Sequence, residues 1–432
     1  MTNTPVKLDP RYWKLSINAS MASYLDAAIL ISAGIALPLW TERFSMNTWW
    51  VGALSTILTL SVAVGSFFGG RLSDRFGRVM VFNLDILFVV IGALVVAFAP
   101  NLAVLVAGIV IVGLASGADL PTSLAVISER VPERFQGKII SSTELFWLGG
   151  IVIPQGVGFL VAGIGYAGIY VMFGLIALIA LITWLVRIAM PSFKVLEDEL
   201  LAENAAENAA HGGNGDKAYP LSGLLGNKRF LVPLIFLTVY YLMWNLSANT
   251  WGSFQTYFMV TIGGRSQSYA TAVGFIANVL AIITTYAVFV RFADTSKRYI
   301  VMIVGVTCGI LSWVVSAFAG GQWMVFTICY VIYSITNTLH GEPIYKIWSQ
   351  QLFPANARAT ATGFTYAIVR FLTAIFGFVT PSLMAYSPSL LLWILVGVLV
   401  LSLVTALCAM KFIRNHEIPD PRFNPKALNG TK

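Results

Sequence analysis

Charged residues are scarce in this sequence: Asp, Glu, Lys and Arg together make up 11% of its 432 residues. A water-soluble protein of this size carries about 25% charged residues. Apolar residues make up 57% of the chain, against roughly 45–50% in soluble domains. This balance excludes a disordered chain and a single water-soluble enzyme domain, and it indicates lipid as the main solvent.

Cysteine is also rare. The three cysteines, Cys308, Cys329 and Cys408, lie inside apolar runs and form no CxxC spacing. That excludes a disulfide framework and predicts neither a zinc site nor a redox site. The motifs HExxH and GxSxG are missing as well, so no metalloprotease or hydrolase site is expected. We therefore expect no metal, no cofactor and no enzymatic activity.

Long apolar runs, in contrast, recur along the whole chain. Each is long enough to cross the roughly 30 Å hydrocarbon core of a bilayer as a helix. The sequence therefore predicts an all-α integral membrane protein with twelve transmembrane helices. The predicted runs are 15–40, 48–70, 79–99, 102–128, 139–163, 166–189, 230–262, 268–290, 299–319, 322–349, 360–385 and 388–413.

The basic residues are distributed unevenly around these runs. If the N-terminus lies inside the cell, the outward-facing gaps contain only Arg43 and Arg265. Most other basic residues lie at the termini or in inward-facing gaps, as Arg130, Lys138 and Arg358 do. By the positive-inside rule, both termini are expected in the cytoplasm. The net charge of +8 is thus a signal of topology, and nucleic-acid binding is not expected.

The composition divides the chain into two halves. We expect an N-terminal six-helix half at 1–190 and a C-terminal six-helix half with a cytoplasmic tail at 230–432. Between them, residues 191–229 are acidic and rich in Ala, Asn and Gly, which is typical of a solvated linker.

The two halves carry matching landmarks. A shift of 220 residues places Asp74 on Asp294 and Arg78 on Arg298. A shift of 222 residues aligns prolines at the ends of spans four and ten. Two landmarks at nearly one offset indicate a duplicated six-span unit, as in transporters built from parallel repeats.

A segment rich in glycine and arginine follows the second run, with Gly70, Leu72, Asp74, Arg75, Gly77 and Arg78 in fixed spacing. It resembles the signature between spans two and three of the major facilitator superfamily. The resemblance implies the twelve-helix fold of that superfamily, with two pseudo-symmetric halves. It also implies a conformational clamp on the cytoplasmic side, formed by Gly70, Asp74, Arg75, Gly77, Arg78, Asp294 and Arg298.

Three further segments are similar to bacterial sugar and polyol porters of the inositol type, namely Tyr24–Asp26, Gly117–Ser123 and Phe353–Thr360. Among the departures from the wider family, two bear on coupling and direction of transport. Ile109 stands where an arginine commonly pairs with the first-span acid, and Ile153 stands where the antiporter signature has glycine. The resemblance therefore favours a porter over a drug exporter, without the usual coupling pair.

Acidic residues inside the predicted helices are candidates for proton coupling. A charge at a helix centre costs about 2.5–3.5 kcal/mol on insertion scales, so such a residue faces a partner or a wet cavity. Asp26 lies near the middle of the first run, whereas Asp119 and Glu342 lie in runs four and ten. Because a low dielectric favours the protonated carboxyl, Asp26 is the first candidate. Glu342 and Lys346 are four residues apart and alternatively neutralise each other.

Amide and indole groups gather in the seventh run, and runs ten and eleven add an amide, an imidazole and a guanidinium. Amides exchange hydrogen bonds with hydroxyls in both directions, and the CH face of a sugar ring stacks on tryptophan. The alternative is that these groups only join helices or anchor the interface. The candidate substrate-binding residues are Trp244, Asn245, Asn249, Gln255, Asn337, His340 and Arg370.

Arg370 requires an anion, because arginine stays charged in proteins. It lies about 15 Å deep in the eleventh run, at 1.5 Å per residue. Glu342 on the neighbouring helix is its first candidate partner, and a substrate carboxylate is the second.

The sequence thus predicts a secondary active transporter in the inner membrane of a bacterial cell, functional as a monomer. It would import a small hydroxylated solute, a polyol or monosaccharide, by proton symport, while its two halves rock in alternating access. An anionic sugar acid or another organic anion is the alternative substrate, and facilitative uniport the alternative mode. A receptor or an intramembrane enzyme is less favoured, since no long cytoplasmic extension and no converging nucleophile and base are found. The expected partners are the solute, protons and the lipid bilayer.

Overall fold

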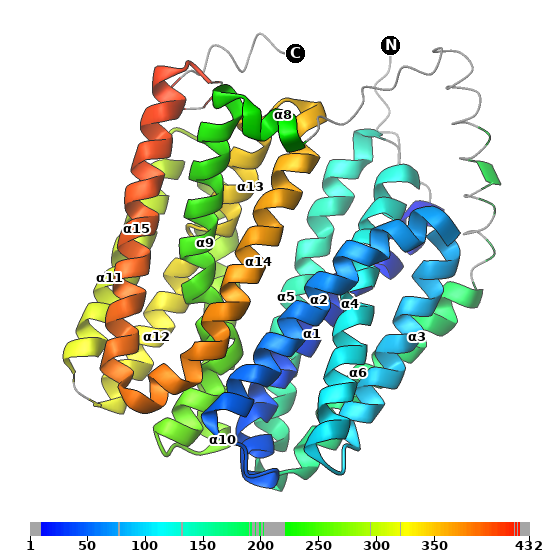
Figure 1. The fold of residues 1–432 in the computed structure, drawn as a ribbon, viewed down its shortest axis with the longest axis vertical. Coiled ribbons are helices and arrows are strands. Elements are labelled where there is room, and N and C mark those ends of the chain that lie inside the picture. The colour runs from blue at the N-terminus through cyan, green and yellow to red at the C-terminus, as the bar shows by residue number, and fades with distance from the viewer. Residues whose placement is uncertain are drawn as a thin grey trace. The chain divides into compact units, whose positions relative to one another are not determined.

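The computed structural model describes residues 10–76, 78–130, 133–189, 221–293, 295–319 and 321–418, with a few further positions in 191–202 and 420–423. Some helical positions are described by their backbone alone. All regular elements in these ranges are helices (Figure 1). The chain forms two compact units, one of residues 1–45 with 57–215 and one of residues 46–56 with 216–432. The predicted boundaries at 190 and 230 stay predictions.

The first unit consists of long helices that contain the first six predicted runs or nearly all of each. Its helices are α1 (Pro10–Arg43), α2 (Thr48–Phe76, from Ile57 onward), α3 (Arg78–Ala97), α4 (Leu102–Arg130), α5 (Glu133–Val161) and α6 (Ala167–Ala189), with the short turn η1 (Ala162–Ile164). Several helices extend beyond the apolar run, because the backbone stays helical into the polar interface. In this unit α3 packs against α4 and α6, and α1 packs against α5 and α4.

Glycines bring α2 and α4 into backbone contact. A Cβ on Gly65 would lie 2.1 Å from the carbonyl oxygen of Leu114. A Cβ on Gly117 would lie 2.1 Å from the carbonyl oxygen of Val62. The Ser66 hydroxyl then donates to the Gly117 carbonyl at 2.9 Å. Small residues at such crossings let membrane helices gain dispersion energy that bulky side chains would prevent.

The second unit contains the remaining predicted runs. Its helices are α8 (Leu221–Gly226), α9 (Lys228–Tyr257), α10 (Gln267–Thr284), α11 (Arg298–Phe318), α12 (Trp323–Asn337), α13 (Glu342–Gln351), α14 (Ala355–Tyr386) and α15 (Pro388–Asn415), with π-helical turns η2 (Phe258–Ile262) and η3 (Thr285–Val290). In this unit α9 packs against α14 and α15, and α11 packs against α12 and α15.

The tenth predicted run is a broken helix. It ends as α12 at Asn337 and resumes as α13 at Glu342. Gly341 in the break has a φ of +75°, which favours glycine. A Cβ at this position would lie 2.1 Å from the Trp244 ring. In the described part of the chain, eleven uninterrupted helices are long and apolar enough to cross a membrane, so the predicted all-α membrane fold is confirmed.

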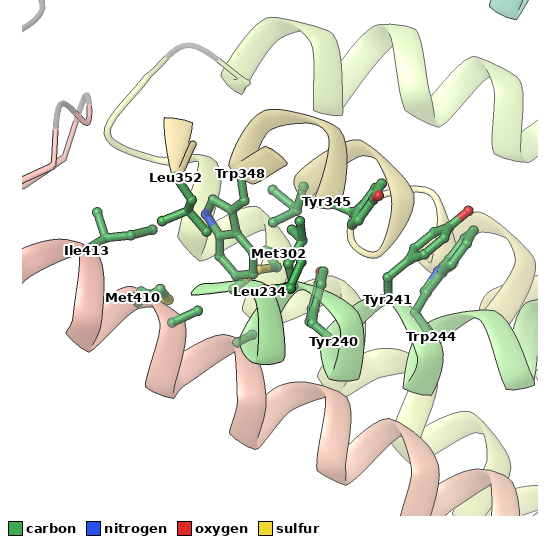
Figure 2. Packing of buried hydrophobic residues seen from close by; sticks show 14 of the residues in the cluster. Leu234, Tyr240, Tyr241, Trp244, Met302, Tyr345, Trp348, Leu352, Met410 and Ile413 are labelled. Carbon is green, nitrogen blue, oxygen red and sulfur yellow. The ribbon is translucent and has the colours of Figure 1, made fainter. Parts of the chain in front are cut away.

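The hydrophobic core of the second unit holds α13 against α9. Figure 2 shows Tyr240 of α9 and Trp348 of α13 close to Met302 and Met410. The rings of Tyr240 and Trp348 have centroids 5.0 Å apart. Buried aromatic side chains of this size dominate core energetics, so α13 keeps a fixed place despite the break that precedes it.

Candidate functional site

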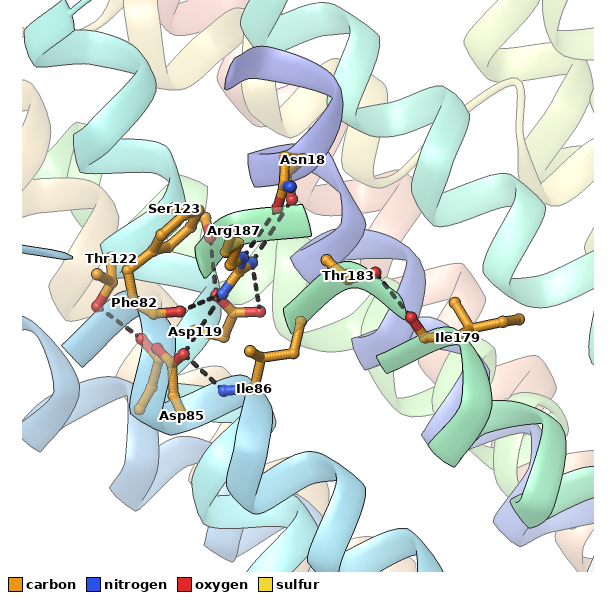
Figure 3. Close-up of polar contacts among 11 residues, drawn as sticks. Asn18, Phe82, Asp85, Ile86, Asp119, Thr122, Ser123, Ile179, Thr183 and Arg187 are labelled. Carbon is orange, nitrogen blue, oxygen red and sulfur yellow. Dashed lines mark hydrogen bonds and ion pairs between the residues drawn. The ribbon is translucent and has the colours of Figure 1, made fainter. Parts of the chain in front are cut away.

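A buried polar cluster in the first unit surrounds Arg187, near the end of α6 (Figure 3). Its guanidinium forms a two-point ion pair with Asp119 of α4, with Nη1–Oδ1 at 3.0 Å and Nη2–Oδ2 at 3.2 Å. Its Nε donates to Asn18 Oδ1 of α1 at 3.0 Å. The Phe82 ring of α3 has its centroid 3.5 Å from the guanidinium carbon, and the Phe82 carbonyl accepts a further hydrogen bond. Four helices therefore meet at one cation.

Asp119 is fully engaged inside this cluster. It is 1% exposed, and the Ser123 hydroxyl donates to its Oδ1 at 2.8 Å in addition to the pair with Arg187. Its predicted role in proton coupling stays a prediction. The sequence did not predict Arg187 as its partner, since an arginine close to the end of an apolar run is typical of an interfacial anchor.

Asp26 lies in the same unit, in the interior of α1. It is 3% exposed, and its Oδ1 accepts a hydrogen bond from the Ser116 hydroxyl of α4 at 3.0 Å. Eight residues separate Asp26 from Asn18, which places it about 12 Å further along the helix. Ile109 supplies no charge to it, and Arg187 pairs with other carboxylates. A buried carboxyl with a hydroxyl neighbour is chemically able to exchange a proton.

Two amide side chains of α9 face α14 in the second unit. Asn245 Oδ1 accepts a hydrogen bond from the Thr373 hydroxyl at 3.0 Å. Asn249 has no hydrogen bond to any described residue, and its Nδ2 would lie 3.8 Å from a Cβ on Gly377. Both side chains are half-buried. They therefore present donors and acceptors that a hydroxylated ligand can use.

Gln255 differs from these two amides. It is buried, and its Nε2 donates to the Ala270 carbonyl of α10 at 2.9 Å. The Thr256 hydroxyl donates to its Oε1 at 3.3 Å. This amide joins α9 to α10, so the structure does not bring it together with Asn245 and Asn249 as a ligand contact.

Stacked aromatic rings lie beside the break in the tenth span. Tyr241 stacks on Trp244 with centroids 5.7 Å apart and on Tyr345 with centroids 4.2 Å apart; Figure 2 shows the three rings close to one another. Trp244 Nε1 donates to the Asn337 carbonyl at 3.4 Å. Flat apolar ring faces next to polar groups are suited to a ring-shaped hydroxylated solute.

Unsatisfied polar atoms accompany this break. Asn337 Oδ1 and both ring nitrogens of His340 are buried and lack a hydrogen-bond partner in the described part of the chain. A buried polar group left unpaired costs about 1–3 kcal/mol. His340 is fully buried, so Asn337, at the end of α12, is the better placed of the two to contact a ligand.

Glu342 pairs with Lys346, at 3.2 Å from its Nζ. This confirms the predicted mutual neutralisation over four residues. The predicted pair between Glu342 and Arg370 is wrong, because no ion pair of Arg370 is found with any described residue. Arg370 instead lies within electrostatic reach of the Tyr241 and Tyr366 hydroxyls.

The predicted clamp is described only in part. Gly77 and Asp294 lie outside the described residues, as do the side chains of Asp74 and Arg78 and the surroundings of Gly70. The clamp therefore stays a prediction at these positions.

Two arginines of the predicted clamp are described. Arg75 is exposed and lies over the Phe76 ring, 5.5 Å from its centroid. Arg298 is buried and forms an ion pair with Asp420, which also accepts a hydrogen bond from the Tyr299 hydroxyl at 2.6 Å. Arg298 thus ties the segment after α15 to the start of α11.

Comparisons with known proteins place these features in a family context. A family model described as Major Facilitator Superfamily matches residues 17–378. The minor myo-inositol transporter IolF of Bacillus subtilis is 26% identical over 375 residues, covering 86% of this chain and 84% of the relative. The glucose transporter GlcP of Staphylococcus epidermidis is 24% identical over 381 residues, covering 83% and 82%. A crystal structure of a D-xylose-proton symporter superimposes with a TM-score of 0.74 at 16% identity, covering 91% of this chain and 97% of that one.

Proposed function

The chain belongs to the Major Facilitator Superfamily, and from this premise we propose that it imports a small hydroxylated solute, a polyol or a monosaccharide, together with a proton. Membership makes the chain a multi-pass membrane transporter and not an enzyme. The position of both termini in the cytoplasm and of the protein in the inner membrane belongs to the same proposal, because it rests on the distribution of basic residues.

One observation carries the choice of solute. In the second unit, the half-buried amides Asn245 and Asn249 lie on the same helix as Trp244, whose ring stacks with Tyr241. Such a set offers both donors and acceptors to hydroxyls and a flat face to ring CH groups. The relatives named for myo-inositol and glucose transport support the same class of solute.

Proton coupling is assigned to Asp26 within this proposal. A buried carboxylate near the centre of a membrane helix is costly when ionised, and Asp26 has a hydroxyl neighbour and no arginine from position 109. One proton that crosses the membrane potential releases about 2.3 kcal/mol per 100 mV, which is sufficient to accumulate a neutral solute.

A second candidate solute is an anionic sugar acid. Arg370 is half-buried in α14 and has no ion pair with any described residue. A guanidinium in this position would pair well with a ligand carboxylate, and uptake of an acid with a proton would remain possible.

The test is a thermal-shift screen of the purified full-length protein against myo-inositol, D-glucose, D-xylose and D-glucuronate. A ligand at about 100 times its Kd stabilises the folded state by about 2.7 kcal/mol. We expect the neutral solutes to raise the melting temperature, and Asn249→Ala to weaken binding about two- to tenfold through one lost hydrogen bond. The exposed Asn415→Ala serves as the control.

The outcomes separate the candidates. A shift with D-glucuronate alone, lost in Arg370→Gln, would replace the neutral solute by the acid. No shift with any of the four compounds, or unchanged binding in Asn249→Ala, would contradict the proposed site.

A further inference from the structure

Asp85 of α3 is a buried carboxylate to which the proposed function gives no role. It is 5% exposed. Its Oδ1 accepts the Ile86 N–H at 2.7 Å and lies 3.5 Å from Arg187 Nη1. Its Oδ2 is buried and has no hydrogen-bond partner in the described part of the chain. Among the described residues, one carboxylate oxygen is therefore left without compensation.

The charges around Asp85 do not balance. From α4 the titratable group that faces it is Asp119, and from α6 the charged group is Arg187, whereas α1 contributes the neutral amide of Asn18 (Figure 3). Among the described residues, two carboxylates thus share one guanidinium. Like charges that share a buried site do not both ionise readily, so one of the two carries a proton over some range of pH.

Geometry decides which of the two carboxylates is protonated. Asp119 holds both Nη atoms of Arg187 at 3.0 and 3.2 Å and accepts the Ser123 hydroxyl. Asp85 has a single longer contact with the same guanidinium. A two-point pair of this kind is the strongest charge-assisted arrangement available to a carboxylate, so Asp119 keeps the guanidinium and Asp85 does not.

We infer that Asp85 is a proton-binding residue of this transporter, with the proton on Oδ2 while Asp119 stays paired with Arg187. The site is distinct from Asp26. It lies at the level where α3 begins and α6 ends, and in the proposed topology that end faces the cytoplasm. Asp85 would therefore exchange its proton with water on the cytoplasmic side and make the transport rate respond to internal pH.

The role in transport rests on the proposed function, but the proton itself can be measured without any solute. In the purified full-length protein, an infrared pH titration follows the C=O stretching band of protonated carboxyl groups. We expect a titrating band in the parent that is lost in Asp85→Asn and kept in Asp26→Asn, which separates it from any band of the Asp26 carboxyl. The exposed Asp198→Asn provides a control with the same chemical change, and its bands should match those of the parent.

A second variant keeps the test decisive if Asp85→Asn does not fold. In Asp119→Asn, Asp85 is the remaining carboxylate that contacts Arg187 among the described residues. The band of the protonated Asp85 carboxyl should therefore disappear at a pH about one to three units lower than in the parent. A cluster that only holds the helices together, with both carboxylates ionised throughout, would show no such band and no such shift. The absence of such a band or of the shift, or titrating bands that are all retained in Asp85→Asn, would overturn the inference.

Transport measurements separate this inference from the proposed symport. In proteoliposomes, Asp85→Asn should lose the response of uptake to internal pH, while Asp26→Asn should lose accumulation and keep the Asp85 band. If uptake in the parent ignores the proton gradient but the band titrates, symport fails and the Asp85 site stands. If symport is observed and the band is the same in Asp85→Asn, the Asp85 site fails and symport stands.

Discussion

Replacing Arg187 by glutamine measures how much the buried cation contributes to the first unit. The change removes the ion pair with Asp119, the bond to Asn18 and the contact with the Phe82 ring. Breaking a buried pair from one side costs about 3–5 kcal/mol, and the lost cation–π contact adds about 0.5–2 kcal/mol. We therefore expect a loss of at least about 4 kcal/mol. At about 2 °C or more per kcal/mol, the melting temperature should fall by about 8 °C or more.

The assay is thermal unfolding of the detergent-solubilised protein, with Arg265→Gln as the matched control. Arg265 is exposed, so its removal should change stability by less than about 0.5 kcal/mol. The double variant Arg187→Gln/Asp119→Asn removes both charges of the pair and should recover at least about 2 kcal/mol of the loss, because one buried carboxylate is no longer stranded. A melting temperature of Arg187→Gln within about 2 °C of the parent would refute the reasoning.

Three further substitutions test separate parts of the structure. Gly341→Ala should destabilise the protein by more than about 2 kcal/mol in thermal unfolding, since alanine disfavours the positive φ and its Cβ would meet the Trp244 ring; unchanged stability would contradict the described break. Asp26→Asn should abolish accumulation in proteoliposomes but preserve solute exchange, and uptake that still follows the pH gradient as in the parent would reject its coupling role. Lys346→Ala should change stability by less than about 1 kcal/mol, because its pair with Glu342 is partly exposed and screened; a loss of several kcal/mol would mean that the pair is a core element.

The helices can be predicted from the long apolar runs of the sequence, because only helices and closed barrels satisfy every backbone hydrogen bond inside hydrocarbon. The fourth predicted run, 102–128, corresponds to α4 at Leu102–Arg130. The break in the tenth run coincides with a change of composition, since Trp323–Asn337 is apolar and Glu342–Gln351 contains charged and amide side chains. The local signal for the break is the pair Gly341 and Pro343, two helix-breaking residues within three positions.

Contacts between helices are harder to predict than the helices themselves. The four-residue spacing of Glu342 and Lys346 fixes their distance within one helix turn, and their pair is found as predicted. The meeting of Arg187 with Asp119 depends on how each helix is rotated about its axis and which helices are neighbours. Neither property follows from spacing along a single run. Asp85 is visible in the sequence as an acidic residue inside the third predicted run, but its place beside Arg187 is not.

The glycine crossing of α2 and α4 has a consequence for the biogenesis of the protein. Glycine has no rotamers to lose, so backbone contact at Gly65 and Gly117 forms without the entropy cost that ordering long side chains carries. In lipid, where association gains little from the hydrophobic effect, such contacts are a main source of affinity between helices. We therefore expect the hairpin of α3 and α4 to dock onto α2 at an early step in the assembly of the first unit.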